Sequence, residues 1–213
     1  MKSLITFGLR IVVALLLIIT LLTVIKNQAD LNVIYIFVYI ALMVLSLLSD
    51  KFFYKGEKTE NDGEEHNTTS HFLALAWFLT LVLPVMEYSI TQRDELIISI
   101  FGIVMVLSGT MIRGISIRTL GNFFSRDVEA WHHQRIIKTG IYKYIRHPAY
   151  TGNIVQILGF PLVLNSYYSL MMSLITILIF LWRIRVEEAF LSERFHEYRE
   201  YMNQTKKIIP KIW

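Results

Sequence analysis

The stretch Gly140-Ile-Tyr-Lys-Tyr-Ile-Arg-His-Pro-Ala-Tyr-Thr-Gly152 joins a polar segment to an apolar one that continues to Trp182. Proline suits the first turn of a helix, and the residue before a proline avoids the α conformation. The stretch therefore predicts that a polar loop ends at His147 and that an apolar helix begins at Pro148. A second polar cluster, Arg183-Ile-Arg-Val-Glu-Glu188, follows the apolar region. Polar groups at both ends of an apolar hairpin indicate a site at a membrane surface, which is typical of an enzyme rather than of a passive anchor.

The apolar region Tyr150–Trp182 is too long for one membrane crossing. Asn165-Ser166, near its middle, suits the turn of a tight helical hairpin. Gly152 and Gly159 lie seven residues apart on one face of the first helix, which allows a neighbouring helix or a ligand to approach closely. Free backbone N–H groups at the start of that helix favour an anionic ligand group.

The rest of the chain has the composition of a membrane protein. The whole chain contains 213 residues, of which 54% are hydrophobic and only 18% charged, and its mean hydropathy is +0.47. A helix needs roughly 20 apolar residues to cross a bilayer, and helices satisfy their own backbone hydrogen bonds in lipid. Four runs before residue 113 are close to this length: Ile5–Ile25, Leu31–Ser49, Phe72–Ile90 and Leu96–Ile112. We predict an all-α, multi-pass membrane helical bundle with four N-terminal spans and a C-terminal helical hairpin.

We expect the first run to remain as a helix rather than to be cleaved as a signal peptide. Asn27-Gln-Ala-Asp30 offers no small-residue cleavage pattern, and another span follows at once. The chain has no cysteine, so disulfides and Cys-based metal sites are excluded. His132 and His133 have no convincing partner ligands, and we expect no metal.

The basic residues predict the orientation of the bundle. With the N-terminus in the cytoplasm, all but Lys26 and Arg93 of the 21 Lys and Arg residues fall on the cytoplasmic side. This asymmetry follows the positive-inside rule. The formal charge of +4 is thus a topology signal, with some attraction to anionic lipids, and gives no indication of nucleic-acid binding.

The chain divides into two parts with different content. Residues 1–112 are mostly spans joined by short connections, apart from a charged, solvated connection at Asp50–Ser70. Residues 113–213 hold most of the titratable and aromatic groups. We therefore expect residues 1–112 to form the transmembrane part and residues 113–213 to form the catalytic part.

The second polar cluster has two possible interpretations. Arg183 and Glu187 are four residues apart and Arg185 and Glu188 are three apart, so both pairs can meet along a helix. Such pairs suit an ordinary helix end at the membrane surface, whereas ionisable groups near lipid also favour a partner or a cavity. The residues around Arg146 and His147 also have two possible interpretations. They could form part of a site, or they could anchor a helix at the lipid headgroups, with the nearby tyrosines as an aromatic belt.

An amphipathic cytoplasmic helix should follow the second cluster. Apolar residues recur there at helical spacing: Val186, Phe190, Leu191, Phe195, Tyr198 and Met202. Charged residues fall mainly on the other side, which predicts that the apolar stripe packs against the bundle or the membrane surface.

The same residues resemble the isoprenylcysteine carboxyl methyltransferase family. The resemblance lies in Gln134-Arg-Ile-Ile-Lys-Thr-Gly-Ile-Tyr-Lys-Tyr-Ile-Arg-His-Pro-Ala-Tyr150 and in a later run. That run comprises Arg183, Glu187-Glu188, Leu191, Phe195, Tyr198, Tyr201 and Ile209-Pro210. The match covers about residues 118–211. It implies a multi-pass membrane enzyme that transfers a methyl group from S-adenosylmethionine, held on the cytoplasmic side, to a lipophilic acceptor.

The resemblance also implies roles for individual residues. The residues implied to bind the cofactor are Gln134, Arg135, Ile136, Ile137, Tyr142, His147, Pro148, Ala149, Tyr150 and Glu187. Arg183 is expected to bind the acceptor. The family often has His where this chain has Gln134; Gln still donates and accepts hydrogen bonds, and His133 is the alternative. Transfer to a carboxylate needs no general base, whereas a thiol, phenol or amine acceptor would need one, with His147 the first candidate.

Two other functions fit the same residues. A membrane reductase using NADPH is one, because some sterol-reductase-like proteins are similar to the C-terminal organisation of this chain, including a Tyr-rich helix before an Ile-Pro end. A non-catalytic membrane partner or scaffold is the other. The expected partners are membrane lipids and a lipophilic small-molecule or prenylated substrate. The sequence determines neither the acceptor nor the oligomeric state.

Overall fold

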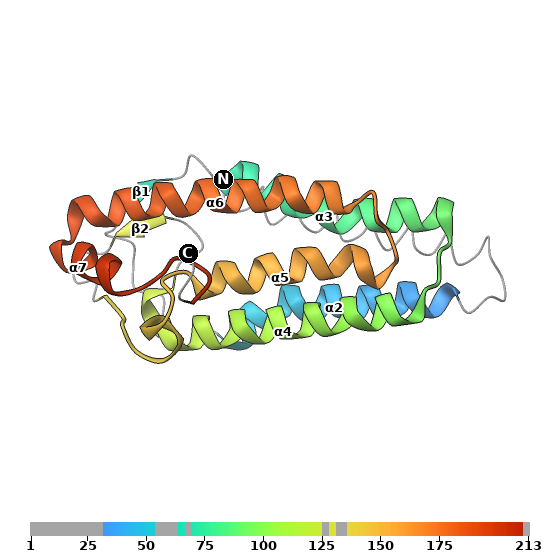
Figure 1. The fold of residues 1–213 in the computed structure, drawn as a ribbon, viewed down its shortest axis with the longest axis horizontal. Helices are drawn as coiled ribbons and strands as arrows, with labels where there is room; N and C mark the ends of the chain where they lie inside the picture. Colours follow the sequence, from blue (N-terminus) through green and yellow to red (C-terminus); the bar gives the residue numbers. More distant parts are fainter. Residues whose placement is uncertain (1–31, 54–63, 67–69, 125–127, 131–135, 211–213) are drawn as a thin grey trace.

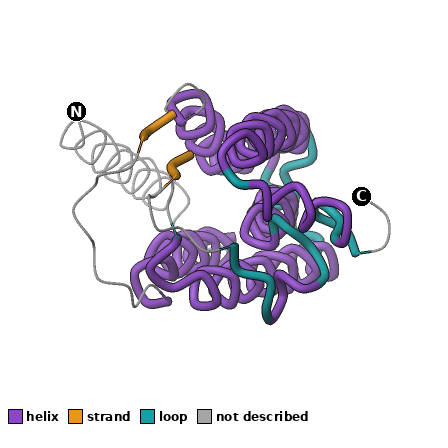
Figure 2. Tube along the Cα trace, turned by 90° about the vertical axis from the view of Figure 1, so that its left-hand side faces the viewer, coloured by secondary structure: helices purple, strands orange, loops and turns teal. Residues whose placement is uncertain are grey.

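The structure is a computed structural model, and it describes residues 32–53, 64–66, 70–124, 128–130 and 136–210. Its long helices run side by side along the longest axis (Figure 1). They are α2 (Asn32–Phe53), α3 (Ser70–Thr91), α4 (Leu96–Leu120), α5 (Pro148–Val163) and α6 (Leu170–Arg194). Seen from the end, they form a single bundle (Figure 2). The predicted span Ile5–Ile25 lies outside the described residues.

Three of the described helices are long and apolar enough to cross a membrane: α2, α3 and α4. Each covers one of the predicted spans, so the helical membrane fold is confirmed for this part of the chain. α4 continues past the predicted end at Ile112 to Leu120. Ser116 and Thr119 donate to the carbonyls four residues earlier, and the helix stops only at Gly121, whose φ of +54° favours glycine.

The predicted hairpin is present as α5 and α6. The connection between them includes Asn165, which has a φ of +52°, a conformation that Asn tolerates. Asn165 donates to Ser99 Oγ (2.8 Å), and Ser166 donates to the carbonyl of Pro84 (2.8 Å). The turn is therefore at the predicted position and is fastened to α3 and α4.

Glycines bring α4 and α5 into close contact. A Cβ on Gly152 would lie 2.6 Å from the carbonyl oxygen of Gly109, and one on Gly159 would lie 2.9 Å from that of Gly102. On each helix the two glycines are seven residues apart, and they lie on one face. The glycine face of α4 therefore packs against the glycine face of α5. The predicted role of Gly152 and Gly159 in close helix approach is confirmed.

The predicted single amphipathic helix is wrong in its continuity. α6 ends at Arg194 and α7 begins at His196, ending at Gln204. Phe195 between them has an extended backbone and packs against Leu191, Tyr198 and Tyr201. The aromatic stripe is therefore divided between α6 and α7, with Phe195 at the break.

Small elements complete the fold. Strands β1 (Glu64–His66) and β2 (Val128–Ala130) pair antiparallel, with Glu65 opposite Glu129, so the all-α prediction missed one short strand pair. Two 3-10 turns are η1 (Gly121–Phe123) and η2 (Gly140–Lys143).

Candidate active site

The polar loop before α5 is held by the end of the chain. Ile145 forms an isolated parallel bridge with Lys206. The amide of Arg146 donates to the carbonyl of Lys206 (2.8 Å), and that of His147 to the carbonyl of Lys207 (2.9 Å). We call Thr205–Ile208 the C-terminal strap. Because these two amides bind the strap, an anionic ligand at the start of α5 would meet amides further into its first turn.

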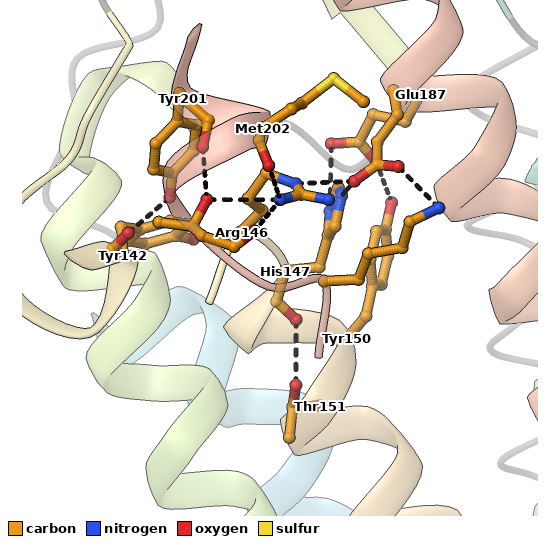
Figure 3. Close-up of polar contacts among 11 residues, drawn as sticks. Tyr142, Arg146, His147, Tyr150, Thr151, Glu187, Tyr201 and Met202 are labelled. Atoms are coloured by element: carbon orange, nitrogen blue, oxygen red, sulfur yellow. Dashed lines mark hydrogen bonds and ion pairs between the residues drawn. The ribbon is translucent and has the colours of Figure 1, made fainter. Parts of the chain in front are cut away.

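Glu188 is the centre of a buried ionic cluster that includes Arg146 and His147, which are labelled in Figure 3. One oxygen accepts from Arg146 Nε (2.8 Å) and faces His147 Nε2 (3.3 Å), and the other lies 2.9 Å from Lys207 Nζ. Its side chain is 5% exposed. Burial by itself would raise the pKa of Glu188, but hydrogen bonds from His147, Lys207 and Arg146, together with the charge of His147, lower it to about 2. Glu188 therefore stays ionised and binds three groups from distant parts of the chain.

Arg146 extends this cluster to α7 and the strap. Its Nη1 donates to the carbonyl of Met202 (3.0 Å) and to that of Thr205. Arg146 itself is buried. The guanidinium thus joins the start of α5, the end of α6 and the C-terminal strap, a role for which its planar fork of donors is suited.

Glu187, next to Glu188, faces a different set of groups. Its Oε2 accepts from the hydroxyl of Tyr150 (2.7 Å), and that hydroxyl accepts from Arg183 Nε (3.0 Å). Arg183 is 1% exposed, whereas the side chain of Glu187 is 26% exposed. His147 Nδ1 lies 3.9 Å from Glu187 Oε1, so His147 sits between the two carboxylates.

Tyr142 lies at the same end of the bundle. It is buried, and its carbonyl accepts from the hydroxyl of Tyr201 (2.5 Å). Burial raises the pKa of Tyr142 well above its usual range, and the nearby carboxylate of Glu187 raises it further. The phenol is therefore a neutral hydrogen-bonding group at physiological pH.

The two ends of the hairpin meet, as the sequence predicts. We call this region, residues 146–150 with residues 183–188, the ionic end. The predicted site residues that contacts bring together there or beside it are Tyr142, His147, Tyr150, Arg183 and Glu187, and Pro148 and Ala149 lie in the same turn of the chain between His147 and Tyr150. Ile136 packs against the aromatic cluster of Leu191, Tyr198 and Tyr201. Gln134 and Arg135 lie outside the described residues.

Three residues of the cluster were not predicted to meet. From the sequence, Arg146 is a possible headgroup anchor, Lys207 a topology signal, and Glu188 a partner of Arg185. No spacing rule connects residue 207 with residue 188, so only the fold could bring them together. One signal in the sequence could have indicated the cluster. Charged residues are dense in the segments before and after the predicted hairpin, and the hairpin brings these two segments to the same end.

A second ion pair links the site to the N-terminal part of the chain. Asp50 at the end of α2 binds Arg113 of α4 through Nε and Nη2, both at 2.8 Å. The backbone of Arg113 lies against Gly152 in the first turns of α5. The predicted division at residue 112 falls within α4, so the two parts share this helix, and their functional separation stays a prediction.

Taken together, the fold and the site define a multi-pass helical membrane protein with a buried polar centre where a C-terminal hairpin closes on itself. Residues 102–193 match the model of the isoprenylcysteine carboxyl methyltransferase family. The ionic end therefore lies within the part of the chain that matches this family.

Individual relatives agree with this match. The chain is 32% identical to the protein-S-isoprenylcysteine O-methyltransferase of Saccharomyces cerevisiae, over 71% of this chain and 66% of that protein. It is 31% identical to a probable protein-S-isoprenylcysteine O-methyltransferase of Oryza sativa subsp. indica, over 56% of this chain and 65% of that protein. In both cases the match spans just under two thirds of the relative.

A solved structure shares the fold. It is the eukaryotic intramembrane Ras methyltransferase ICMT, with a TM-score of 0.60 and 22% identity, covering 93% of this chain and 75% of that chain.

Proposed function

We propose that this protein transfers a methyl group from S-adenosylmethionine to a lipophilic acceptor, namely the carboxylate of an isoprenylcysteine-like substrate. The observation that carries the proposal is the meeting of Tyr150 with Glu187 and Arg183 across the hairpin. Relatives named protein-S-isoprenylcysteine O-methyltransferase support the substrate class.

The groups at the ionic end fit such a cofactor. Glu187 is partly exposed, and a carboxylate accepts hydrogen bonds from ribose hydroxyls and attracts a cationic sulfur. The first turn of α5 offers amides to a carboxylate of the cofactor. When bound, S-adenosylmethionine supplies an electrophilic methyl group on a cationic sulfur, and transfer to a carboxylate neutralises both charges without moving a proton.

The chain's own residues would then position the reactants. Arg183, buried and hydrogen-bonded to Tyr150, orients the acceptor carboxylate. Glu187 fixes the cofactor, and His147 stacks on the ring of Tyr150 with centroids 5.7 Å apart, so that it acts as a positioning group rather than as a base. The surrounding apolar helices exclude water, which strengthens these charge interactions and favours a reaction between opposite charges. Holding the reacting atoms in line supplies most of the remaining rate enhancement.

The proposal also states which end of the bundle faces the cytoplasm and which part of the chain is catalytic. Exposed cations cluster at the ionic end, including Lys143, Arg185 and Lys206, whereas Arg93 lies near the opposite end of the hairpin. By the positive-inside rule the ionic end faces the cytoplasm. Residues 113–213 then form the catalytic part, and a lipophilic acceptor reaches it from the bilayer.

Calorimetry on the detergent-purified protein tests the proposal. S-adenosylhomocysteine should bind and NADPH should give no signal. An isotopically labelled methyl donor should then label an S-farnesylcysteine derivative with a free carboxylate, but not its methyl ester. Binding of NADPH without binding of S-adenosylhomocysteine would favour a reductase, and silence to both ligands would contradict an enzymatic role.

A further inference from the structure

The hydroxyl of Tyr150 connects two side chains that have different proposed ligands. It accepts a hydrogen bond from Arg183 Nε at 3.0 Å and donates one to Glu187 Oε2 at 2.7 Å. Arg183 and Glu187 are four residues apart on α6, one turn of the helix. A single group from α5 therefore lies between the proposed acceptor residue and the proposed cofactor residue.

The ring that carries this hydroxyl is held on both sides. It stacks on His147 with an interplanar angle of 27°, and its centroid lies 5.5 Å from that of Phe180. His147 is in turn held by Glu188. Because the ring is packed, Tyr150 cannot rotate freely when the position of the Arg183 guanidinium changes. A shift of the guanidinium therefore moves the Tyr150 hydroxyl and, through it, the Glu187 carboxylate.

We propose that the Tyr150 hydroxyl couples the two subsites, so that an anionic acceptor at Arg183 and the cofactor at Glu187 each strengthen the binding of the other. This inference rests on the proposed function, because it requires those two ligands. The acceptor carboxylate fixes Arg183, Arg183 fixes the hydroxyl of Tyr150, and the hydroxyl fixes the carboxylate of Glu187. The ligand that binds second then finds its site already ordered, and donation from Arg183 polarises the hydroxyl toward Glu187.

A purely structural role for Tyr150 makes a different prediction. If the ring only fills the space between His147 and Phe180, phenylalanine does so equally well. Tyr150→Phe therefore removes the hydroxyl while keeping the packing, and it separates the two roles.

The experiment measures the affinity for S-adenosylhomocysteine by calorimetry, alone and with saturating N-acetyl-S-farnesylcysteine. In the wild-type protein the acceptor should tighten binding by about five-fold or more, a typical coupling between sites. In Tyr150→Phe the ratio of the two affinities should fall close to one, in addition to any overall loss of affinity. By reciprocity, S-adenosylhomocysteine should tighten binding of the acceptor by the same factor in the wild type.

Two controls isolate the hydroxyl and the carboxylate. Tyr144→Phe changes a tyrosine that is 62% exposed near the same end, and it should keep the wild-type ratio. The methyl ester of the acceptor lacks the charge that Arg183 would bind, and it should give no tightening. Equal tightening by acid and ester would overturn the coupling route through Arg183.

The failures of the two proposals are distinguishable. If S-adenosylhomocysteine binds the wild type but the acceptor has no effect, or if Tyr150→Phe keeps the full ratio, the coupling is refuted while the proposed function stands. If S-adenosylhomocysteine does not bind the wild-type protein, both proposals are refuted.

Discussion

The two ends of the α5–α6 hairpin are both polar and buried, but they are built differently. At the turn end, residues 164–169, Glu87 of α3 accepts from the amides of Tyr168 and Ser169 and from the hydroxyl of Ser169. Asn165 and Ser166 bind α4 and α3. Each of these contacts satisfies a polar group that the turn itself creates, as burial in a bundle requires.

The ionic end contains more charge than a connection between helices requires. Glu188 with Arg146, His147 and Lys207 forms a closed cluster around one carboxylate. Glu187, the neighbouring carboxylate, is more exposed and is bound to Tyr150. From this difference we expect Glu188 to hold the structure together and Glu187 to be the carboxylate that a ligand can reach. Four measurements test this distinction, from the largest expected effect to the smallest.

Replacement of Glu188 by Ala should be the most destabilising change. It would leave Arg146, His147 and Lys207 close together without their shared anion, and breaking a buried pair in this way costs about 3–5 kcal/mol. The apparent free energy of unfolding in mixed micelles, titrated with sodium dodecyl sulfate, measures the loss. Arg185→Ala, at an exposed cation of the same helix, serves as the control and should change stability by less than about 0.5 kcal/mol. Similar losses in both variants would show that the cluster is not a structural centre.

The pH dependence of stability should report the same carboxylate. Because the pKa of Glu188 in the folded protein is about 2, below its ordinary value of 4.5, its contribution is present above about pH 4.5 and is lost as the pH falls toward 2. The full contribution is about 3 kcal/mol. The difference in unfolding free energy between the wild type and Glu188→Gln should therefore shrink as the pH is lowered through this window. If the difference in unfolding free energy stays constant between pH 4.5 and pH 2, the ionised carboxylate of Glu188 is not a source of stability.

Glu187→Gln should act on the ligand rather than on stability. Loss of hydrogen bonds to a charged acceptor should weaken binding of S-adenosylhomocysteine about 10- to 100-fold, equivalent to about 1.5–3 kcal/mol. Its unfolding free energy should change by less than about 1 kcal/mol, since the amide can still accept from Tyr150. Glu193→Gln, at an exposed carboxylate of the same helix, should bind like the wild type. An unchanged affinity in Glu187→Gln would remove Glu187 from the proposed site.

At the turn end, Glu87→Gln should lower stability by only about 1 kcal/mol, because one of its two oxygens is replaced by a donor that faces other donors. The affinity for S-adenosylhomocysteine should not change. A loss of affinity in this variant would show that the two ends of the hairpin are functionally linked, contrary to the distinction drawn here.

The sequence by itself determined the features that depend on local rules. Apolar length predicts the helices that became α2, α3 and α4, Pro148 predicts the start of α5, and Asn165 predicts the turn. Each of these signals is contained within a few residues or one helix. The resemblance in residues 134–150 and 183–210 also named several residues that the structure brings together at the ionic end, whereas their roles stay a prediction.

Only the tertiary structure decided how the charges are shared. Glu188 binds Arg146, His147 and Lys207 because the C-terminal strap folds back over the start of α5, and its spacing from Arg185 gives no hint of this. Phe195, at the break between α6 and α7, likewise contacts a cluster of Leu191, Tyr198 and Tyr201 that forms only in the fold. These features depend on which distant segments come into contact. Helical periodicity shows that Glu188 could pair with Arg185 on the same helix, but it does not show whether Glu188 pairs with residues across the bundle instead.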